Sequence, residues 1–220
     1  MKKLLLATAL TAAFASSAFA ENDAFYVRLD AGAGMAPQQK YQGGVDKLKS
    51  STHFVGGLGV GVYLMENVRT ELSLSNHFSV NQTSKGNAAG KDKLKATATS
   101  VHIKGLVDVY DYGMGQLFVG AGAGLTQLGA KLTHSTPASA AGVVPAVAAT
   151  STTYKAKKSM GFSWLLTAGT AFDVAEGVKL DVAYTYENAG STKALKAGNA
   201  SYGKYKFSSH NLTAGVRFEL

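Results

Sequence analysis

The last eleven residues read His210-Asn211-Leu212-Thr213-Ala214-Gly215-Val216-Arg217-Phe218-Glu219-Leu220, with apolar and polar side chains alternating to the end. Successive side chains of a β-strand point to opposite faces, so this period of two predicts a strand with one apolar face. The sequence contains no run of 18 apolar residues that would predict a membrane-spanning helix. With the export signal described next, this strand predicts a β-barrel in an outer membrane.

The first twenty residues have the three parts of a secretory signal peptide. Lys2 and Lys3 form the positive region, residues 4–14 the apolar region, and Ala18-Phe19-Ala20 the cleavage site. The apolar run is shorter than the roughly 20 residues of a membrane-spanning helix, which disfavours the alternative of an uncleaved anchor. We therefore expect a cleaved signal peptide at 1–20 and one outer-membrane β-barrel domain at 21–220.

The composition agrees with a single exported domain. The chain has 220 residues and no cysteine, which excludes disulfides and thiolate metal sites. Its mean hydropathy is +0.02, as expected where apolar and polar faces alternate and cancel. Removal of residues 1–20 would leave 20 basic and 14 acidic residues, a net charge of +6. No linker rich in proline, glycine or serine divides the mature sequence.

Eight segments show the strand period. They are 24–34, 52–64, 68–80, 96–110, 116–128, 159–174, 178–188 and 210–220. Each is long enough for a tilted membrane crossing of about 9–11 residues. The even number allows an antiparallel sheet to close with both chain ends on the same side.

The connections alternate between short and long. Tight turns are expected at 65–67, 111–115 and 175–177, and long loops at 35–51, 81–95, 129–158 and 189–206. This arrangement predicts an all-β, eight-stranded antiparallel up-and-down transmembrane β-barrel with four long extracellular loops. The alternative, a soluble lipocalin-like barrel, would turn its apolar face inward and leave a charged outer face.

Ten charged residues fall on the face opposite the apolar band and are expected inside the barrel. They are Arg28, Asp30, Arg69, Glu71, Lys104, Asp108, Lys179, Asp181, Arg217 and Glu219. The hairpin registers that we infer pair Arg69 with Asp108, Glu71 with Lys104, Asp181 with Arg217, and Lys179 with Glu219. Closure of the barrel is expected to pair Arg217 with Asp30 and Glu219 with Arg28. A barrel of eight strands is only wide enough for its own side chains, so these charges predict an interlocked polar core rather than a pore.

The sequence offers little support for catalysis or cofactor binding. The runs Gly57–Gly61 and Gly120–Gly124 place glycine at every second residue, and no helix follows them, unlike a dinucleotide-binding turn. An enzyme would need a nucleophile and a base at the outer rim, where His53, His77, His134, Ser135 and His210 are candidates. Asp46 and Asp92 are the only acids in the expected loops, and neither is in a convincing position to orient a histidine. We expect no catalytic, cofactor or metal site.

The expected loops contain fifteen lysines and two acids. The candidate ligand-binding lysines are Lys40, Lys47, Lys49, Lys91, Lys93, Lys95, Lys155, Lys157, Lys158, Lys193, Lys196, Lys204 and Lys206. This positive surface would attract lipopolysaccharide phosphates, sulfated host glycans or acidic protein segments. Ordinary solvation with lipopolysaccharide pairing, and a dedicated host ligand, both remain open. The location of the loops excludes nucleic acid. The stretch 137–152 consists mostly of small residues and is expected to be mobile.

Several strand and turn motifs resemble the small outer-membrane surface proteins of rickettsiae. They are Val27–Gly32, Gly59–Leu72, Phe118–Gly122, Phe172–Lys179 and His210–Phe218. More distantly, the chain is similar to the eight-stranded adhesion and invasion barrels of other Gram-negative bacteria. The resemblance implies an adhesin that recruits the host glycoprotein vitronectin through exposed loops. It also implies contact with outer-membrane lipid and lipopolysaccharide, and with the barrel-assembly machinery during biogenesis.

Overall fold

The computed structural model describes residues 25–37, 48–84, 91–136, 138, 149–193, 195–197, 200–202 and 204–220. The predicted signal peptide at 1–20, most of the stretch 137–152, and Lys40 and Lys47 lie outside the described residues. Every regular element within the described part is a β-strand. The same residues include no helix that is long and apolar enough to cross a membrane.

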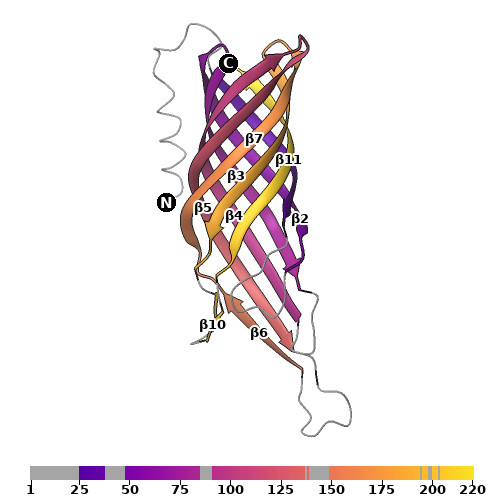
Figure 1. Cartoon of the computed structure of the whole chain (residues 1–220), viewed down its shortest axis with the longest axis vertical. Helices are drawn as coiled ribbons and strands as arrows, with labels where there is room; N and C mark the ends of the chain where they lie inside the picture. Colours follow the sequence, from indigo (N-terminus) through magenta and orange to yellow (C-terminus); the bar gives the residue numbers. More distant parts are fainter. Residues whose placement is uncertain are drawn as a thin grey trace.

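Eight long strands form the barrel. They are β1 (Phe25–Ala36), β2 (Ser51–Met65), β3 (Val68–Thr83), β4 (Lys91–Asp111), β5 (Gly115–Thr136), β7 (Ser159–Ala175), β8 (Val178–Ser191) and β11 (Lys206–Glu219). All pairings are antiparallel, β5 pairs with β7, and β1 pairs with β11 to close the circle. The predicted eight-stranded antiparallel barrel is therefore confirmed. Figure 1 shows it as a tall, narrow cylinder whose C-terminus lies at the end opposite β6 and β10.

The outward face of the barrel carries a wide apolar band. On β5, for example, Leu117 and Leu125 bound a lipid-facing row and are 42% and 50% exposed. Aromatic side chains gather toward one limit of the band, where the rings of Trp164 and Tyr186 lie 5.5 Å apart. An apolar band with aromatic residues at its border is the outer surface of a transmembrane barrel.

The strands continue well beyond this band at the end opposite the C-terminus, which we call the loop end. β4 has 21 residues and β5 has 22, against the expected 96–110 and 116–128. Three short strands, β6 (Thr150–Lys155), β9 (Leu195–Ala197) and β10 (Ala200–Tyr202), lie in stretches expected to be loops. β6 extends the sheet from β5, and β9 pairs with β6. The prediction of long loops at 81–95 and 129–158 is therefore wrong in part, because residues 81–83, 91–95, 129–136 and 150–155 lie in strands.

The reason is a reversal of polarity along each strand. Beyond the apolar band, Lys91, Lys93 and Lys95 of β4 are exposed, while Leu94 and Ala96, on either side of Lys95, are buried. The alternation therefore continues, but the apolar side chains now point inward. A buried apolar core fills the loop end of the barrel and comprises Ala36, Leu48, Val80, Leu94, Ala96, Ala98, Leu128, Ala130, Leu132, Ala189, Leu195, Tyr205 and Phe207. Its apolar burial holds together a part of the sheet that lies above the lipid.

Tyr205 brings a polar group into this loop-end core. Its hydroxyl donates a hydrogen bond to Gln82 Oε1 at 2.9 Å, so that the buried phenol is satisfied. Burial raises the pKa of Tyr205 above its usual range, which keeps the hydroxyl protonated as a donor. The contact joins the segment before β11 to β3, on which Gln82 lies.

The position of the apolar band predicts that the cost in stability of an outward-facing charge on β5 depends strongly on its depth in the membrane. Ala121 lies inside the band and Gln127 beyond its last exposed leucine, and both side chains point outward. We expect Ala121→Arg to lower the free energy of unfolding by about 2–4 kcal/mol, and Gln127→Arg by about 0–1 kcal/mol. Urea titrations of the protein folded in lipid vesicles measure both. Equal costs for the two variants would contradict this position of the membrane boundary.

Candidate functional site

The barrel interior near the tight turns, which we call the turn end, holds a buried ion network centred on Glu71. Lys104 Nζ and Arg28 Nη2 each lie 3.0 Å from Glu71 Oε1, and the Tyr26 hydroxyl donates to Oε2 at 3.2 Å. Arg28 also lies 3.2 Å from Asp30. The Glu71 side chain is 1% exposed, so its charge is stabilised by these partners rather than by water.

Two further arginines complete the network. Arg69 forms an ion pair with Asp108 at 2.8 Å and places its guanidinium 4.9 Å from the centre of the Phe118 ring. Arg217 lies 3.2 Å from Asp181 and donates to the Tyr63 hydroxyl at 2.9 Å. The ammonium of Lys179 lies 3.8 Å from Glu219 and 3.0 Å from Asp173. These contacts join strands that are adjacent or two places apart around the barrel.

The predicted pairing at the closing seam is wrong. Arg217 lies opposite Arg28 and Glu219 opposite Tyr26, two residues away from the expected register. Arg28 uses Asp30 and Glu71 as partners, and Glu219 accepts a hydrogen bond from Tyr63 at 2.7 Å. The β8–β11 register is displaced by two as well, although the long side chains still reach their partners diagonally. A shift of two keeps every side chain on its face, so the polarity pattern does not detect it.

Glycines make room for the large interior side chains. A Cβ atom added at Gly59 would lie 2.7 Å from the carboxyl carbon of Glu71, and one at Gly61 would collide with the Tyr26 ring. Both are interior positions of β2 between bulky neighbours. Their alternation thus reflects side-chain packing in a narrow barrel.

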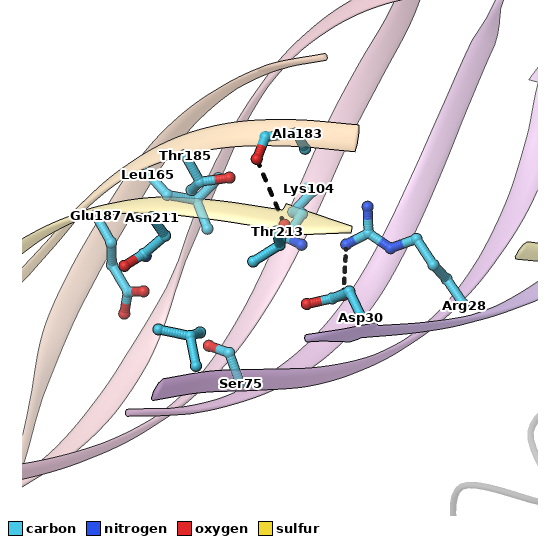
Figure 2. A pocket seen from close by; sticks show the side chains of 11 residues that line it. Arg28, Asp30, Ser75, Lys104, Leu165, Ala183, Thr185, Glu187, Asn211 and Thr213 are labelled. Atoms are coloured by element: carbon cyan, nitrogen blue, oxygen red, sulfur yellow. Dashed lines mark hydrogen bonds and ion pairs between the residues drawn. The ribbon is translucent and has the colours of Figure 1, made fainter. Parts of the chain in front are cut away.

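A second buried polar group lies between the ion network and the apolar core, and sequence reasoning missed its central residue. Glu187 accepts from Ser100 at 2.6 Å and lies 2.9 Å from His77, whose other ring nitrogen is 2.9 Å from His53. The alternation of Asp181, Ala183, Thr185 and Glu187 on one face of β8 was the available signal. Figure 2 shows Glu187 at one end of a cavity and the Arg28–Asp30 pair at the other.

This cavity has a volume of about 40 Å³. Binding sites for organic ligands commonly have about 300–1,000 Å³, so the cavity accommodates water rather than a substrate. His53 and His77 are both buried, which takes them away from the outer rim where an enzyme would need its base. His210 faces the opposite way, and its ring nitrogen lies 2.6 Å from the hydroxyl of the exposed Tyr184.

One expectation about the histidines is overturned. Asp92 does orient a histidine, since its Oδ1 lies 2.6 Å from His134 Nδ1. Asp92 is buried, and its backbone is bonded to Ser84 through both N–H and carbonyl groups. The pair therefore connects β5 to β4 at the loop end, where the sequence predicted loop. Among the described residues there is no group of three or more metal-ligating side chains.

The exposed surface of the loop end is lysine-rich. The described lysines there are all exposed: Lys49, Lys91, Lys93, Lys95, Lys131, Lys155, Lys157, Lys158, Lys193, Lys196, Lys204 and Lys206. Seven of them, at 91, 93, 95, 131, 155, 196 and 206, lie on strands β4, β5, β6, β9 and β11 rather than on loops. At the turn end the exposed charges Glu66, Asp111 and Glu176 are acidic. The two ends of the barrel therefore differ in sign.

Comparison with known proteins agrees with this architecture. Residues 6–218 match the family described as "Outer membrane protein beta-barrel domain". Among solved structures, Neisserial surface protein A superposes with a TM-score of 0.54 at 16% identity, over 89% of this chain and 97% of that chain. The outer membrane protein OprG from Pseudomonas aeruginosa gives a TM-score of 0.52 at 14% identity, over 90% and 97%. These two likenesses show the fold.

The fold and its apolar band define an integral outer-membrane β-barrel protein. The chain belongs to the outer-membrane β-barrel domain family, and rickettsial proteins match it over its full length. A Rickettsia bellii protein named "Putative adhesin" is 37% identical over 235 residues, and a Rickettsia felis protein of the same name is 33% identical over 237 residues. Each comparison covers 100% of both chains. The predicted outer-membrane location is confirmed.

The ion network predicts unequal costs for removing two carboxylates. Glu71→Gln leaves Arg28 and Lys104 without their shared buried counter-charge, and we expect a loss of about 3–5 kcal/mol in the free energy of unfolding. Asp173→Asn also removes one carboxylate that pairs with a lysine, but Asp173 is half exposed. We expect it to cost less than about 1 kcal/mol. Urea unfolding in detergent micelles compares the two, and similar losses would show that Glu71 is not the centre of the core.

Proposed function

We propose that this protein is a surface adhesin that captures an anionic host ligand through its lysine-rich loop end. The ligand is a host glycoprotein of the vitronectin type or a sulfated glycan. In this proposal residues 1–20 are removed as a signal peptide, and residues 21–220 form the mature barrel. The turn end faces the periplasm, and the loop end extends from the cell surface.

The exposed lysines of the loop end carry the proposal. The twelve described there all point to solvent, whereas the described acid of the same region, Asp92, is buried and bonded to His134. A surface of one sign on a rigid scaffold raises the local concentration of an oppositely charged ligand and accelerates its capture. The names of the rickettsial relatives support adhesion as the use of this surface.

The interior favours binding over catalysis. The cavity lined by Glu187 and Asp30 has about 40 Å³, which is too small for an organic substrate, and His53 and His77 are buried. Ser84 accepts a hydrogen bond from the backbone N–H of Asp92, which pairs with His134. We interpret this arrangement as a structural contact between strands. We therefore infer that the protein acts through its outer surface and is not an enzyme.

A structural barrel that tightens the membrane by binding lipopolysaccharide phosphates is the second candidate. Lys157 and Lys158 favour it, because they directly precede β7, whose exposed Met160 and Phe162 belong to the apolar band. In that case the purified barrel would bind lipopolysaccharide and show no affinity for a host glycoprotein.

Binding to purified vitronectin tests the adhesin proposal. We expect saturable binding of the refolded barrel that weakens strongly as salt is raised, because the contacts are screened within about 8 Å at physiological ionic strength. Replacing Lys91, Lys93 and Lys95 with glutamine should weaken binding by roughly tenfold or more.

The matched control removes three charges from the turn end by Glu66→Gln, Asp111→Asn and Glu176→Gln. We expect this variant to bind as the unaltered protein does. Equal affinities for all three proteins would contradict ligand capture by the loop-end lysines. Absence of vitronectin and host-cell binding at physiological salt, with lipopolysaccharide binding retained, would favour the structural barrel.

A further inference from the structure

Four lysines lie side by side across the loop-end sheet. In the strand register Lys95 of β4 is opposite Lys131 of β5, Lys131 is opposite Lys155 of β6, and Lys155 is opposite Lys196 of β9. All four side chains are exposed, and as direct cross-strand partners they project from one face of the sheet. We call Lys95, Lys131, Lys155 and Lys196 the lysine row.

The row concentrates like charge at short range. Adjacent strands lie about 4.8 Å apart, so four lysines span about 14 Å. Like charges directly opposite each other destabilise a sheet. The ion pairs formed by lysines in the described part of the chain involve Lys104 and Lys179, and none involves the row. Intramolecular pairing with the described acids therefore does not relieve the repulsion.

The fold fixes the row in place. Residues flanking the row lysines, among them Leu94, Ala96, Ala130, Leu132 and Leu195, are buried in the loop-end core. A shift of one residue in any of these strands would expose that core and bury lysine. The loop-end core therefore holds the four charges at one level, as a preorganised surface.

The surroundings of the row are cationic and hydroxylic. Lys93, Thr133 and Thr153 form the next level away from the membrane. On the membrane side, a Cβ added at Gly129 would lie 3.3 Å from Thr97 Oγ1 and 3.6 Å from Cγ of Lys158. Lys158 therefore lies beside the row as a further cation. Protein partners are commonly anchored by aromatic side chains, and these neighbouring positions provide none.

The row stands above the lipid headgroups. Toward the loop end, Met160 is the last exposed apolar side chain of β7, and it lies opposite Gln127 of β5. Lys131 is four residues beyond Gln127 along β5. Lys95 is six residues beyond Val101. At about 3.3 Å per residue and a tilt near 40°, the row lies about 10–15 Å above the apolar band. Phospholipid headgroups occupy about 5–8 Å on each side of a bilayer, so the row lies beyond such a layer and is accessible to a soluble polymer.

We propose that the lysine row is a binding site for a linear sulfated polysaccharide, whose closely spaced sulfates match a line of cations and whose hydroxyls match the threonines beside it. The proposal rests on the adhesin function and names one ligand class and one surface for it. Charge-assisted hydrogen bonds from the ammonium groups to sulfate oxygens replace lysine–lysine repulsion with attraction.

The test uses heparin as the probe and the full mature chain in detergent free of lipopolysaccharide. Lys131→Gln with Lys155→Gln removes the two central charges of the row and should weaken heparin binding by at least roughly tenfold. The control, Glu66→Gln with Glu176→Gln, also removes two exposed charges, but at the turn end and outside the loop-end surface. It should change the affinity by less than about twofold.

The source of the anion is tested separately. Hyaluronan, a linear carboxylate polymer without sulfate, should bind much more weakly than heparin. Lipopolysaccharide vesicles should bind both double variants about equally. If the row variant instead loses lipopolysaccharide binding while heparin binding stays unchanged, the ligand is the membrane's own lipid and the proposal is overturned.

A stability measurement guards against a folding defect. Because the row lysines repel one another, the Lys131→Gln, Lys155→Gln variant should unfold at a urea concentration equal to or higher than that of the unaltered protein. Saturating heparin should raise the midpoint of the unaltered protein and the control but not that of the row variant. A row variant that is stabilised by heparin as much as the control would overturn the proposal.

The outcomes separate this inference from the adhesin function. Equal heparin affinities for the row and control variants, with vitronectin binding retained, would reject the lysine row and leave the adhesin proposal standing. Failure of the unaltered protein to bind heparin, vitronectin or host cells would reject both.

Discussion

Hydrogen bonding of the backbone in lipid is the constraint on which this structure depends. No water is available in the hydrocarbon to satisfy N–H and C=O groups, so strands that cross it must pair on both sides. The pairings of β1 with β11 and of β5 with β7 meet that demand by closing the circle. Closure with eight strands also makes the barrel narrow, and the remaining features of the interior follow from that width.

The narrow interior is filled in two different ways. In the turn-end half, Glu71, Arg69 and Arg217 are buried with partners for their charges, because the outward face must be apolar to meet lipid. Above the membrane the outward face meets water, and the interior becomes apolar around Leu132 and Phe207. One continuous sheet thus has two cores of opposite polarity. The Glu187–His77 group lies where they meet.

The loop-end core has a consequence for function. Because Leu94 and Leu132 are held inside, the lysines that alternate with them are held outside, on strands rather than on free loops. A rigid strand surface loses little conformational entropy on binding. The same packing that stabilises the extension therefore presents Lys131 and Lys155 as neighbours.

The sequence by itself determined the barrel, its eight strands and the inward position of the charges, because a period of two assigns each side chain to a face. It did not determine register, since a shift of two residues leaves every face unchanged, and Arg28 consequently lies opposite Arg217 rather than Glu219. The extension of β4 and β5 was missed because its lysines point outward where the membrane pattern has apolar residues. Only the tertiary structure decided that Lys95, Lys131, Lys155 and Lys196, from four separate strands, share one row, because strand pairing brings distant segments together.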